Sequence, residues 1–253
     1  MIFACTKKQP ININDLILSG DNKTHNSKEN NKPYSGPVFY TDENQRVFLE
    51  GSLKDGIKDD IWTYWNNDGT KISGYVDFPP NGYTGKVISF QKDKKTISEI
   101  STFKEGIKQG PSVYYYSNGN REERTYKDGI KQGSSVWYGS DGDRAEFTYK
   151  DGVKQGPSVW YGSDGSREEF TFKEGLKQGP SVYYFSNRDR EERTFKDGVR
   201  QGPFIFYSSS RGKFRGDKEG GIYIDGKKEG ESIYYYSDGT TKSFFYKNNQ
   251  RLE

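Results

Sequence analysis

Carboxylate side chains recur through the middle of the sequence, and they are the residues best suited to acid–base chemistry. Glu122, Glu123 and Asp128 could pair as a general acid and a general base, as the two carboxylates of a glycosidase do. Carboxylates recur at one fixed interval through residues 105–202. An active site is singular, whereas these carboxylates form a series. We therefore expect no catalytic residues and no enzymatic activity.

Cysteine and histidine are almost absent from the sequence. Cys5 is the one cysteine and His25 the one histidine, so the chain can form neither an internal disulfide nor a zinc site built from cysteine and histidine. His25 lies in a polar stretch, and we expect it to be a solvated surface residue rather than a ligand. These counts predict no metal and no cofactor.

Aromatic side chains are the other candidates for function, because they recur in columns. Phe, Trp and Tyr make up 16% of the residues and all hydrophobic types 30%, so aromatic rings supply more than half of the apolar content. We predict that one row of equivalent positions binds a protein or a glycan. The alternative is that these rings only stabilise the sheet by packing on one another. The row consists of Tyr114, Trp137, Trp160, Tyr183, Phe206 and Tyr234.

The charges of the chain are balanced and mixed. Lys and Arg total 39, Asp and Glu total 36, and both signs interleave within each repeat. Because no basic stripe of a single sign stands out, we expect no nucleic-acid partner. No apolar run approaches the roughly 20 residues of a transmembrane helix. A membrane contact is expected only through a lipid anchor.

The elements that position these side chains are repeats of one fixed length. A fixed period of roughly 20–50 residues indicates a repeat array. The repeated phrase begins with Asp-Gly or Glu-Gly and continues through Lys-Gln-Gly to an aromatic pair. Its first glycine recurs at Gly106, Gly129, Gly152, Gly175 and Gly198, and its second at Gly110, Gly133, Gly156, Gly179 and Gly202. The period, which is the interval from Gly106 to Gly129, is therefore 23 residues, an odd number.

Each repeat predicts one β-hairpin. Residues 111–116 are rich in aromatic and β-branched types, and residues 121–126 alternate as a return strand. Asn118-Gly119 between them favours a two-residue type I′ turn. Two such turns per repeat would require an even period, so the odd period predicts one extra residue in each repeat. We place it in a bulge at Gly133 and its copies.

A two-residue turn at Asn118-Gly119 also predicts the two faces of the sheet, because it sets Tyr115 opposite Glu122 and Val113 opposite Arg124. One face is then expected to collect Val113, Tyr115, Tyr126 and the column of Arg124. The other is expected to collect the aromatic row beside the columns of Arg121, Glu123 and Thr125.

The repeats extend over residues 32–253, in about nine copies of which the first are degenerate. The predicted fold is all-β, an elongated single antiparallel sheet of consecutive hairpins. Residues 1–31 are expected to form a separate segment, a remnant of a lipoprotein signal followed by a polar tether. Within it, residues 11–18 alternate as a strand that could cover the first edge of the sheet, and residues 19–31 are expected to be a flexible loop.

The phrase of residues 128–142, with its glycines, aromatic pair and closing Asp-Gly, resembles the bacterial variant of the MORN repeat. Pro33-Tyr34-Ser35-Gly36 is similar to the first repeat of such proteins, and the resemblance covers residues 32–251. It implies antiparallel hairpins and a binding or scaffold role, with no catalytic residues. Many members are predicted lipoproteins, others are labelled YwqK-type antitoxins, and MORN repeats elsewhere are associated with lipid and protein contacts.

Two functional hypotheses follow. The first is a bacterial envelope lipoprotein that binds a protein or glycan partner. Ile2-Phe3-Ala4-Cys5 resembles the end of a lipoprotein signal, in which Cys5 would carry the lipid. Because a signal needs more apolar residues before the cysteine, this hypothesis expects the true start to lie upstream. The alternative is a cytoplasmic antitoxin that binds a partner toxin. Short Gly-aromatic repeats also resemble cell-wall-binding modules, which keeps polysaccharide as a minor alternative.

Overall fold

The computed structural model describes residues 8–20, 24–65, 71–76, 82–91, 96–209 and 217–252. The chain divides into two compact units, Met1–Lys108 and Gln109–Glu253. Both consist of β-strands, mostly in consecutive antiparallel hairpins, with one short 3-10 helix in the first unit. The predicted all-β class is confirmed. The boundary predicted between residues 31 and 32 stays a prediction.

The first unit pairs most of its neighbouring strands antiparallel, but β1 with β4 and β7 with β8 are parallel pairs. Its elements are β1 (Ile11–Asn12), η1 (Ile13–Asp15), β2 (Ile17–Leu18), β3 (His25–Asn26), β4 (Gly36–Thr41), β5 (Val47–Lys54), β6 (Ile57–Trp65), β7 (Lys71–Val76), β8 (Gly85–Phe90) and β9 (Ile97–Lys104).

The N-terminal segment docks on this unit. Strand β1 pairs with β4, as expected of a strand that covers the edge. The residues after it form η1 rather than continuing the strand, and they bring Ile13 and Leu16 into a core with Val38, Leu49, Leu53 and Trp62. The predicted loop at residues 19–31 is wrong in one part, because β3 pairs with β2. The backbone N–H of His25 also donates to the Gly56 carbonyl at 2.8 Å.

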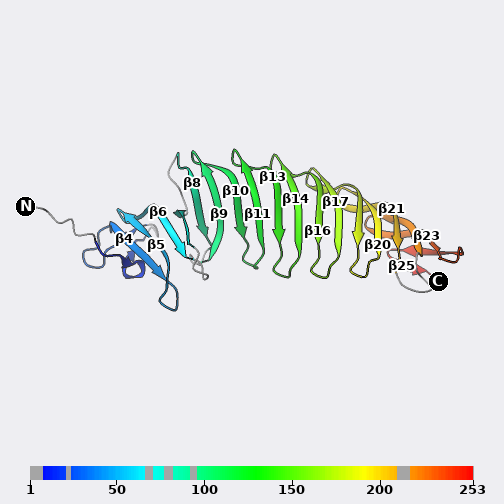
Figure 1. Ribbon diagram of the computed structural model, residues 1–253, viewed down its shortest axis with the longest axis horizontal. Coiled ribbons are helices and arrows are strands. Elements are labelled where there is room, and N and C mark those ends of the chain that lie inside the picture. Colours follow the sequence, from blue (N-terminus) through cyan, green and yellow to red (C-terminus); the bar gives the residue numbers. More distant parts are fainter. Residues whose placement is uncertain are drawn as a thin grey trace, which may run out of the picture. The chain divides into compact units, whose positions relative to one another are not determined.

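In the second unit the strands follow one another side by side in chain order (Figure 1). They are β10 (Ile107–Tyr115), β11 (Arg121–Lys127), β12 (Ile130–Lys131), β13 (Gly133–Tyr138), β14 (Arg144–Lys150), β15 (Val153–Lys154), β16 (Gly156–Tyr161), β17 (Arg167–Lys173), β18 (Leu176–Lys177), β19 (Gly179–Tyr184), β20 (Arg190–Lys196), β21 (Val199–Tyr207), β22 (Lys218–Ile224), β23 (Lys227–Tyr235), β24 (Thr241–Lys247) and β25 (Gln250–Leu252).

The turn at Asn118-Gly119 differs from the prediction. Tyr116 donates its N–H to the Asn120 carbonyl at 2.9 Å, which leaves three residues in the loop. Gly119 has φ +86°, but Asn118 does not have a positive φ. The Asn118 side chain instead accepts the N–H of Asn120 at 3.2 Å. This is the three-residue hairpin in which a type I turn precedes a left-handed glycine.

The two-residue turn lies at the other end of the hairpin, at Asp128-Gly129. Both residues have positive φ, 51° and 79°, as a type I′ turn requires. Lys127 and Ile130 form the closing pair. The Lys-Gln-Gly connector supports these turns, because the side-chain carbonyl of Gln132 accepts the N–H of Asp151 at 2.7 Å, and the following repeats copy this bond. The repeated glutamine therefore links each turn to the next.

The irregularity predicted at the second glycine is present. Strand β11 pairs with β12 at Tyr126 and Lys131 and with β13 at Glu123 and Val136. Between these two pairs β11 advances three residues, whereas the segment from β12 to β13 advances five. Gly133, with φ +83°, lies in this insertion. The insertion adds two residues, so it leaves the side-chain alternation unchanged. The single extra residue that makes the period odd is in the three-residue turn, and its predicted place at Gly133 was wrong.

This turn also corrects the predicted faces. Tyr114 pairs with Glu122 and Val113 with Glu123, one residue away from the expected register, and a shift of one residue exchanges the side-chain faces of a strand. One face, here called the Tyr114 face, carries the aromatic row with the columns of Glu122, Arg124 and Tyr126. The opposite Val113 face carries Tyr115 and the columns of Arg121, Glu123 and Thr125.

Candidate functional site

The register places all six predicted aromatic residues on the Tyr114 face, where they alternate with a second column that is mostly glutamate. The rings are half-buried. The carboxylates between them are buried, with Glu122 only 4% exposed. Across the strands the sequence of paired residues is Tyr114, Glu122, Trp137, Ala145, Trp160, Glu168, Tyr183, Glu191, Phe206, Glu219 and Tyr234.

Each of two buried carboxylates is held by several donors. Glu122 accepts from the Tyr116 hydroxyl at 2.7 Å, the Arg124 guanidinium at 2.6 Å and the Ser135 hydroxyl at 3.1 Å. A buried charge is tolerated when such partners replace its lost water. The same arrangement returns at Glu168, which accepts from Lys177 at 2.6 Å, Ser181 at 2.9 Å and Arg193 at 2.8 Å.

These environments lower the pKa of the two glutamates and raise that of a neighbouring tyrosine. Burial alone raises the pKa of Glu122, but the hydrogen bonds from Arg124 and Tyr116 and the charge of Arg124 outweigh it and lower that pKa. Burial likewise opposes Lys177 and Arg193 at Glu168, whose pKa is also lowered. The pKa of Tyr149 is raised to about 12 by burial and by the nearby Glu122 carboxylate. Glu122 and Glu168 are therefore charged anchors, and neither is poised as an acid near neutral pH.

Acid should consequently weaken this unit. Because the pKa values of Glu122 and Glu168 are lower in the folded chain, the unfolded chain binds more protons as the pH falls. Their contribution to stability is complete above the ordinary glutamate pKa of about 4.3 and is lost as the pH falls through the lowered values. We expect urea unfolding midpoints to drop between neutral pH and pH of about 3, and Glu168→Gln to flatten this slope. An unchanged slope in Glu168→Gln would contradict the assignment.

Lysines cross the same face and lie on aromatic rings. The ammonium nitrogen of Lys177 is 3.9 Å from the centre of the Phe170 ring and that of Lys154 is 3.8 Å from Phe147. A cation over a ring face is attracted by the ring quadrupole. Lys228 repeats the contact on Phe204 at 4.4 Å. On the Tyr114 face, aromatic rings, carboxylates and lysine or arginine cations therefore contact one another.

In four members of the aromatic row, the residue two positions later packs against the ring or leaves room for it. Tyr114 and Tyr183 are followed by rings at Tyr116 and Phe185, which they meet edge to face at 4.7 Å. Trp137 and Trp160 are followed by glycines, Gly139 and Gly162, and each indole reaches over its glycine. A side chain on either glycine would overlap the indole, so the larger ring and the glycine occur together.

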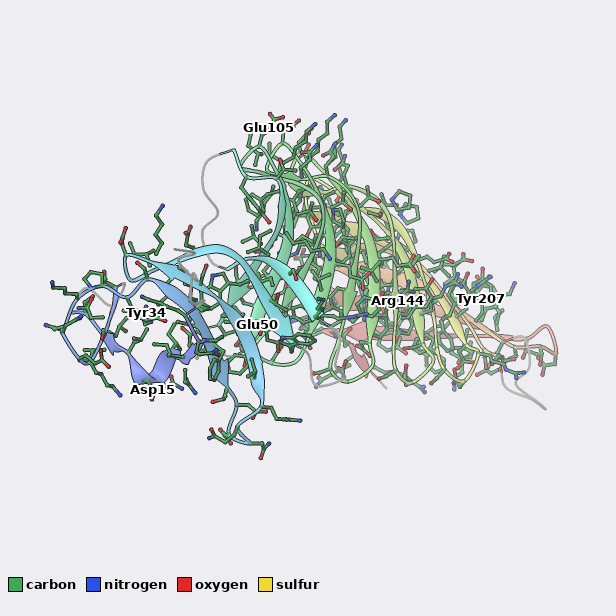
Figure 2. The ribbon with its side chains drawn as sticks, turned by 60° about the vertical axis from the view of Figure 1, so that its left-hand side comes forward. Asp15, Tyr34, Glu50, Glu105, Arg144 and Tyr207 are labelled. Atoms are coloured by element: carbon green, nitrogen blue, oxygen red, sulfur yellow. The ribbon has the colours of Figure 1, made fainter. Side chains whose placement is uncertain are left out.

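The Val113 face differs in its exposure. Arg121 and Glu123 form an ion pair at 3.2 Å, although their side chains are 45% and 43% exposed. Arg121 also lies 4.2 Å from the centre of the Tyr138 ring. Arg144 and Tyr207, labelled in Figure 2, belong to this face. Exposed ion pairs of this kind contribute about 0–1 kcal/mol each. The charges of this face are solvated, whereas those of the Tyr114 face are enclosed.

Three segments of the chain, residues 100–121, 171–190 and 221–241, match the model of the MORN repeat. These three segments are similar to the MORN repeat. MORN repeats generally serve in binding or as scaffolds, and they are typically non-catalytic. No curated protein is significantly similar to the sequence.

One solved structure with a similar course of the chain is the SAS-4 (dCPAP) TCP domain of Drosophila melanogaster in complex with a proline-rich motif of Ana2 (dSTIL). Its sequence is 14% identical, the match covers 72% of this chain and 86% of that chain, and the TM-score is 0.36. A likeness of this extent says nothing about what this chain binds.

The strand register of the second unit brings together the predicted aromatic row, while its role in binding stays a prediction. Sequence reasoning missed the buried glutamates, because the expected register put Glu123 rather than Glu122 beside the rings. Cys5, the predicted lipid attachment residue, lies outside the described residues. Among the described residues no three His, Cys, Asp or Glu side chains are grouped to hold a metal ion, and none of the described helices is long and apolar enough to cross a membrane.

Proposed function

We propose that this protein is a non-catalytic binding module that receives a protein partner on the Tyr114 face. The observation that carries the proposal is the row of half-exposed rings set between buried carboxylates that already have their partners. Such rings offer a rigid contact area, since the network beneath them holds them in place. Tyrosine, tryptophan and arginine dominate the energetic centres of protein interfaces. A glycan partner would use the same rings and is the alternative outcome of the test.

The proposal includes a place of action. A lipid on Cys5 would hold the protein at a bacterial envelope, and fractionation of cells that express the Cys5→Ser variant from the complete reading frame tests it. A cytoplasmic antitoxin that binds a toxin through the same face is the alternative, and it requires the unsubstituted protein to be soluble in that experiment.

The binding face is tested by paired variants of the full chain. Trp160→Ala/Tyr183→Ala removes two rings from the Tyr114 face, and Tyr161→Ala/Tyr184→Ala removes the next two residues from the Val113 face. Because a central ring typically contributes about 2 kcal/mol or more to binding, we expect the first variant to lose at least about tenfold in affinity. The affinity is measured for the protein recovered by cross-linking in native cells. An equal loss in the second variant would contradict the assignment of the face.

A further inference from the structure

One repeat lacks the buried carboxylate. Ala145 occupies the position that Glu122 and Glu168 occupy in the repeats on either side, between Trp137 and Trp160 in the register. Alanine removes the carboxylate and the carbons beyond Cβ. The residues around this position, here called the Ala145 site, show what the missing group would have bound.

The first of these residues is a lysine. Elsewhere in the described residues a lysine binds the glutamate nine residues before it. Lys177 does so with Glu168 at 2.6 Å, Lys228 with Glu219 at 2.9 Å and Lys108 with Glu99 at 2.7 Å. Lys154 stands nine residues after Ala145. Within the described ranges of the chain it has no ion pair, and its ammonium group rests on the rings of Phe147 and Phe172 at 3.8 and 5.3 Å.

The second residue is a serine. Ser135 and Ser181 stand thirteen residues after Glu122 and Glu168 and donate their hydroxyls to those carboxylates at 3.1 and 2.9 Å. Ser158 has the same place relative to Ala145 and is only 4% exposed. Its hydroxyl donates instead to the Gly156 carbonyl at 3.5 Å, the long limit of a hydrogen bond. Lys154 and Ser158 therefore occupy the same positions as the donors of the other repeats, but the carboxylate that would accept from both is absent at Ala145.

The electrostatics agree with this geometry. Burial lowers the pKa of Lys154, the neighbouring Lys131 lowers it further, and Glu122 acts in the opposite direction. The carboxylate of Glu122 is already bound by Tyr116, Arg124 and Ser135. A partly buried cation gains most from a carboxylate that approaches it directly.

We propose that the Ala145 site binds the carboxylate of an aspartate or glutamate side chain of the partner protein, between Trp137 and Trp160 and on Lys154 and Ser158. This inference rests on the proposed function of the Tyr114 face and names the chemistry of its partner. A side chain carries its carboxylate on a slender methylene stem, like the glutamates of the other repeats. A uronic acid carries it directly on the sugar ring, which would have to enter between the two indoles.

The site can first be filled from within. In Ala145→Glu the new carboxylate should reach Lys154 and Ser158, and we expect the melting temperature to rise by about 2–4 °C above that of Ala145→Gln. The rise should vanish when Lys154→Met is added. A melting temperature of Ala145→Glu at or below that of Ala145→Gln would overturn the proposed complementarity to a carboxylate.

Binding is tested on the full chain with hexaglutamate, hexaglutamine and trigalacturonate as probes. The indole N–H signals of Trp137 and Trp160 and the ε-carbon signal of Lys154 report occupation by NMR. We expect hexaglutamate alone to move them, and its affinity to fall at least about tenfold in Ala145→Glu and Lys154→Met. Lys150→Met removes an equal charge at an exposed position and should bind hexaglutamate like the unsubstituted chain.

The outcomes separate the two proposals. Hexaglutamate binding that survives in Ala145→Glu, or falls equally in Lys150→Met, would overturn the Ala145 site, as would a response to trigalacturonate alone. The proposed function would stand in those cases if Trp160→Ala/Tyr183→Ala still loses the natural partner. If that variant keeps the natural partner, the proposed function fails whatever the probes show.

Discussion

Replacing Arg193 by alanine is expected to lower the free energy of unfolding by about 3–5 kcal/mol, the loss typical of a broken buried ion pair. The Arg193 guanidinium is 5% exposed and joins two buried carboxylates, Glu168 at 2.8 Å and Glu191 at 3.1 Å. Its removal leaves Glu168 with Lys177 and Ser181. Glu191 keeps the hydroxyl of Tyr223 at 2.7 Å but loses its ion pair. The cost is that of a buried charge without a counter-charge.

The control lies three residues away on the opposite face. Arg190 pairs with Glu192 at 2.9 Å, but their side chains are 40% and 41% exposed, so Arg190→Ala should cost about 1 kcal/mol or less. The two variants remove the same type of side chain from the same strand. Urea unfolding followed by circular dichroism at neutral pH measures both. Equal losses would show that the network of the Tyr114 face contributes no more than a surface ion pair.

The period predicted most of the second unit, because a repeat of fixed length with paired glycines leaves few alternatives to hairpins. The error arose at Asn118-Gly119. Asn-Gly can form a two-residue turn, but its asparagine here bonds to the N–H of Asn120 and the loop gains one residue. Dipeptide preferences cannot predict whether such a pair forms a two-residue or a three-residue turn, since Asp128-Gly129 has nearly the same composition and forms the two-residue turn.

That single residue decided how much of the site could be predicted. The aromatic row was found because its members share a column in every repeat. The glutamates beside it were not, since a shift of one residue exchanges Glu122 for Glu123. The sequence did hold a signal. The column of Glu123 is glutamate in all four clean repeats, whereas that of Glu122 contains Ala145. A column that accepts alanine has a different environment from one that keeps its charge.

The first unit was harder to predict, because its packing depends on contacts of residues outside the periodic pattern. Its core includes Ile13 and Leu16, which lie outside the periodic region and come into place through the 3-10 helix after β1. Alternation predicted a strand there. A bond from the N–H of Asn14 to the side chain of Asn12 caps the helix instead. Local capping of this kind competes with strand formation at asparagine.

Trp62→Ala is expected to lower the free energy of unfolding of the first unit by about 3–5 kcal/mol, the usual cost of removing a buried aromatic side chain. Trp62 is 1% exposed and packs in the core with Val38, Leu49 and Leu53. Its indole N–H donates to the Asp59 carbonyl at 3.1 Å. Circular dichroism against urea measures the loss, since the substitution also changes the tryptophan fluorescence that would otherwise report unfolding.

Variants at Ile61 and Gly51 test whether the loss of stability in Trp62→Ala comes from the cavity that the indole leaves. Ile61, the preceding residue, is 54% exposed, and Ile61→Ala should change the free energy of unfolding by about 0.5 kcal/mol or less. Gly51 faces the indole so closely that a Cβ there would overlap it. Gly51→Ala should therefore also destabilise the unit, by about 1–3 kcal/mol through overpacking. In Gly51→Ala/Trp62→Ala the methyl group enters the space that the indole leaves, so the double variant should lose less than the two single losses together. If the losses in the free energy of unfolding of the two single variants simply added in the double variant, Gly51 and Trp62 would not be coupled. The close approach of the indole would then not explain the glycine at position 51.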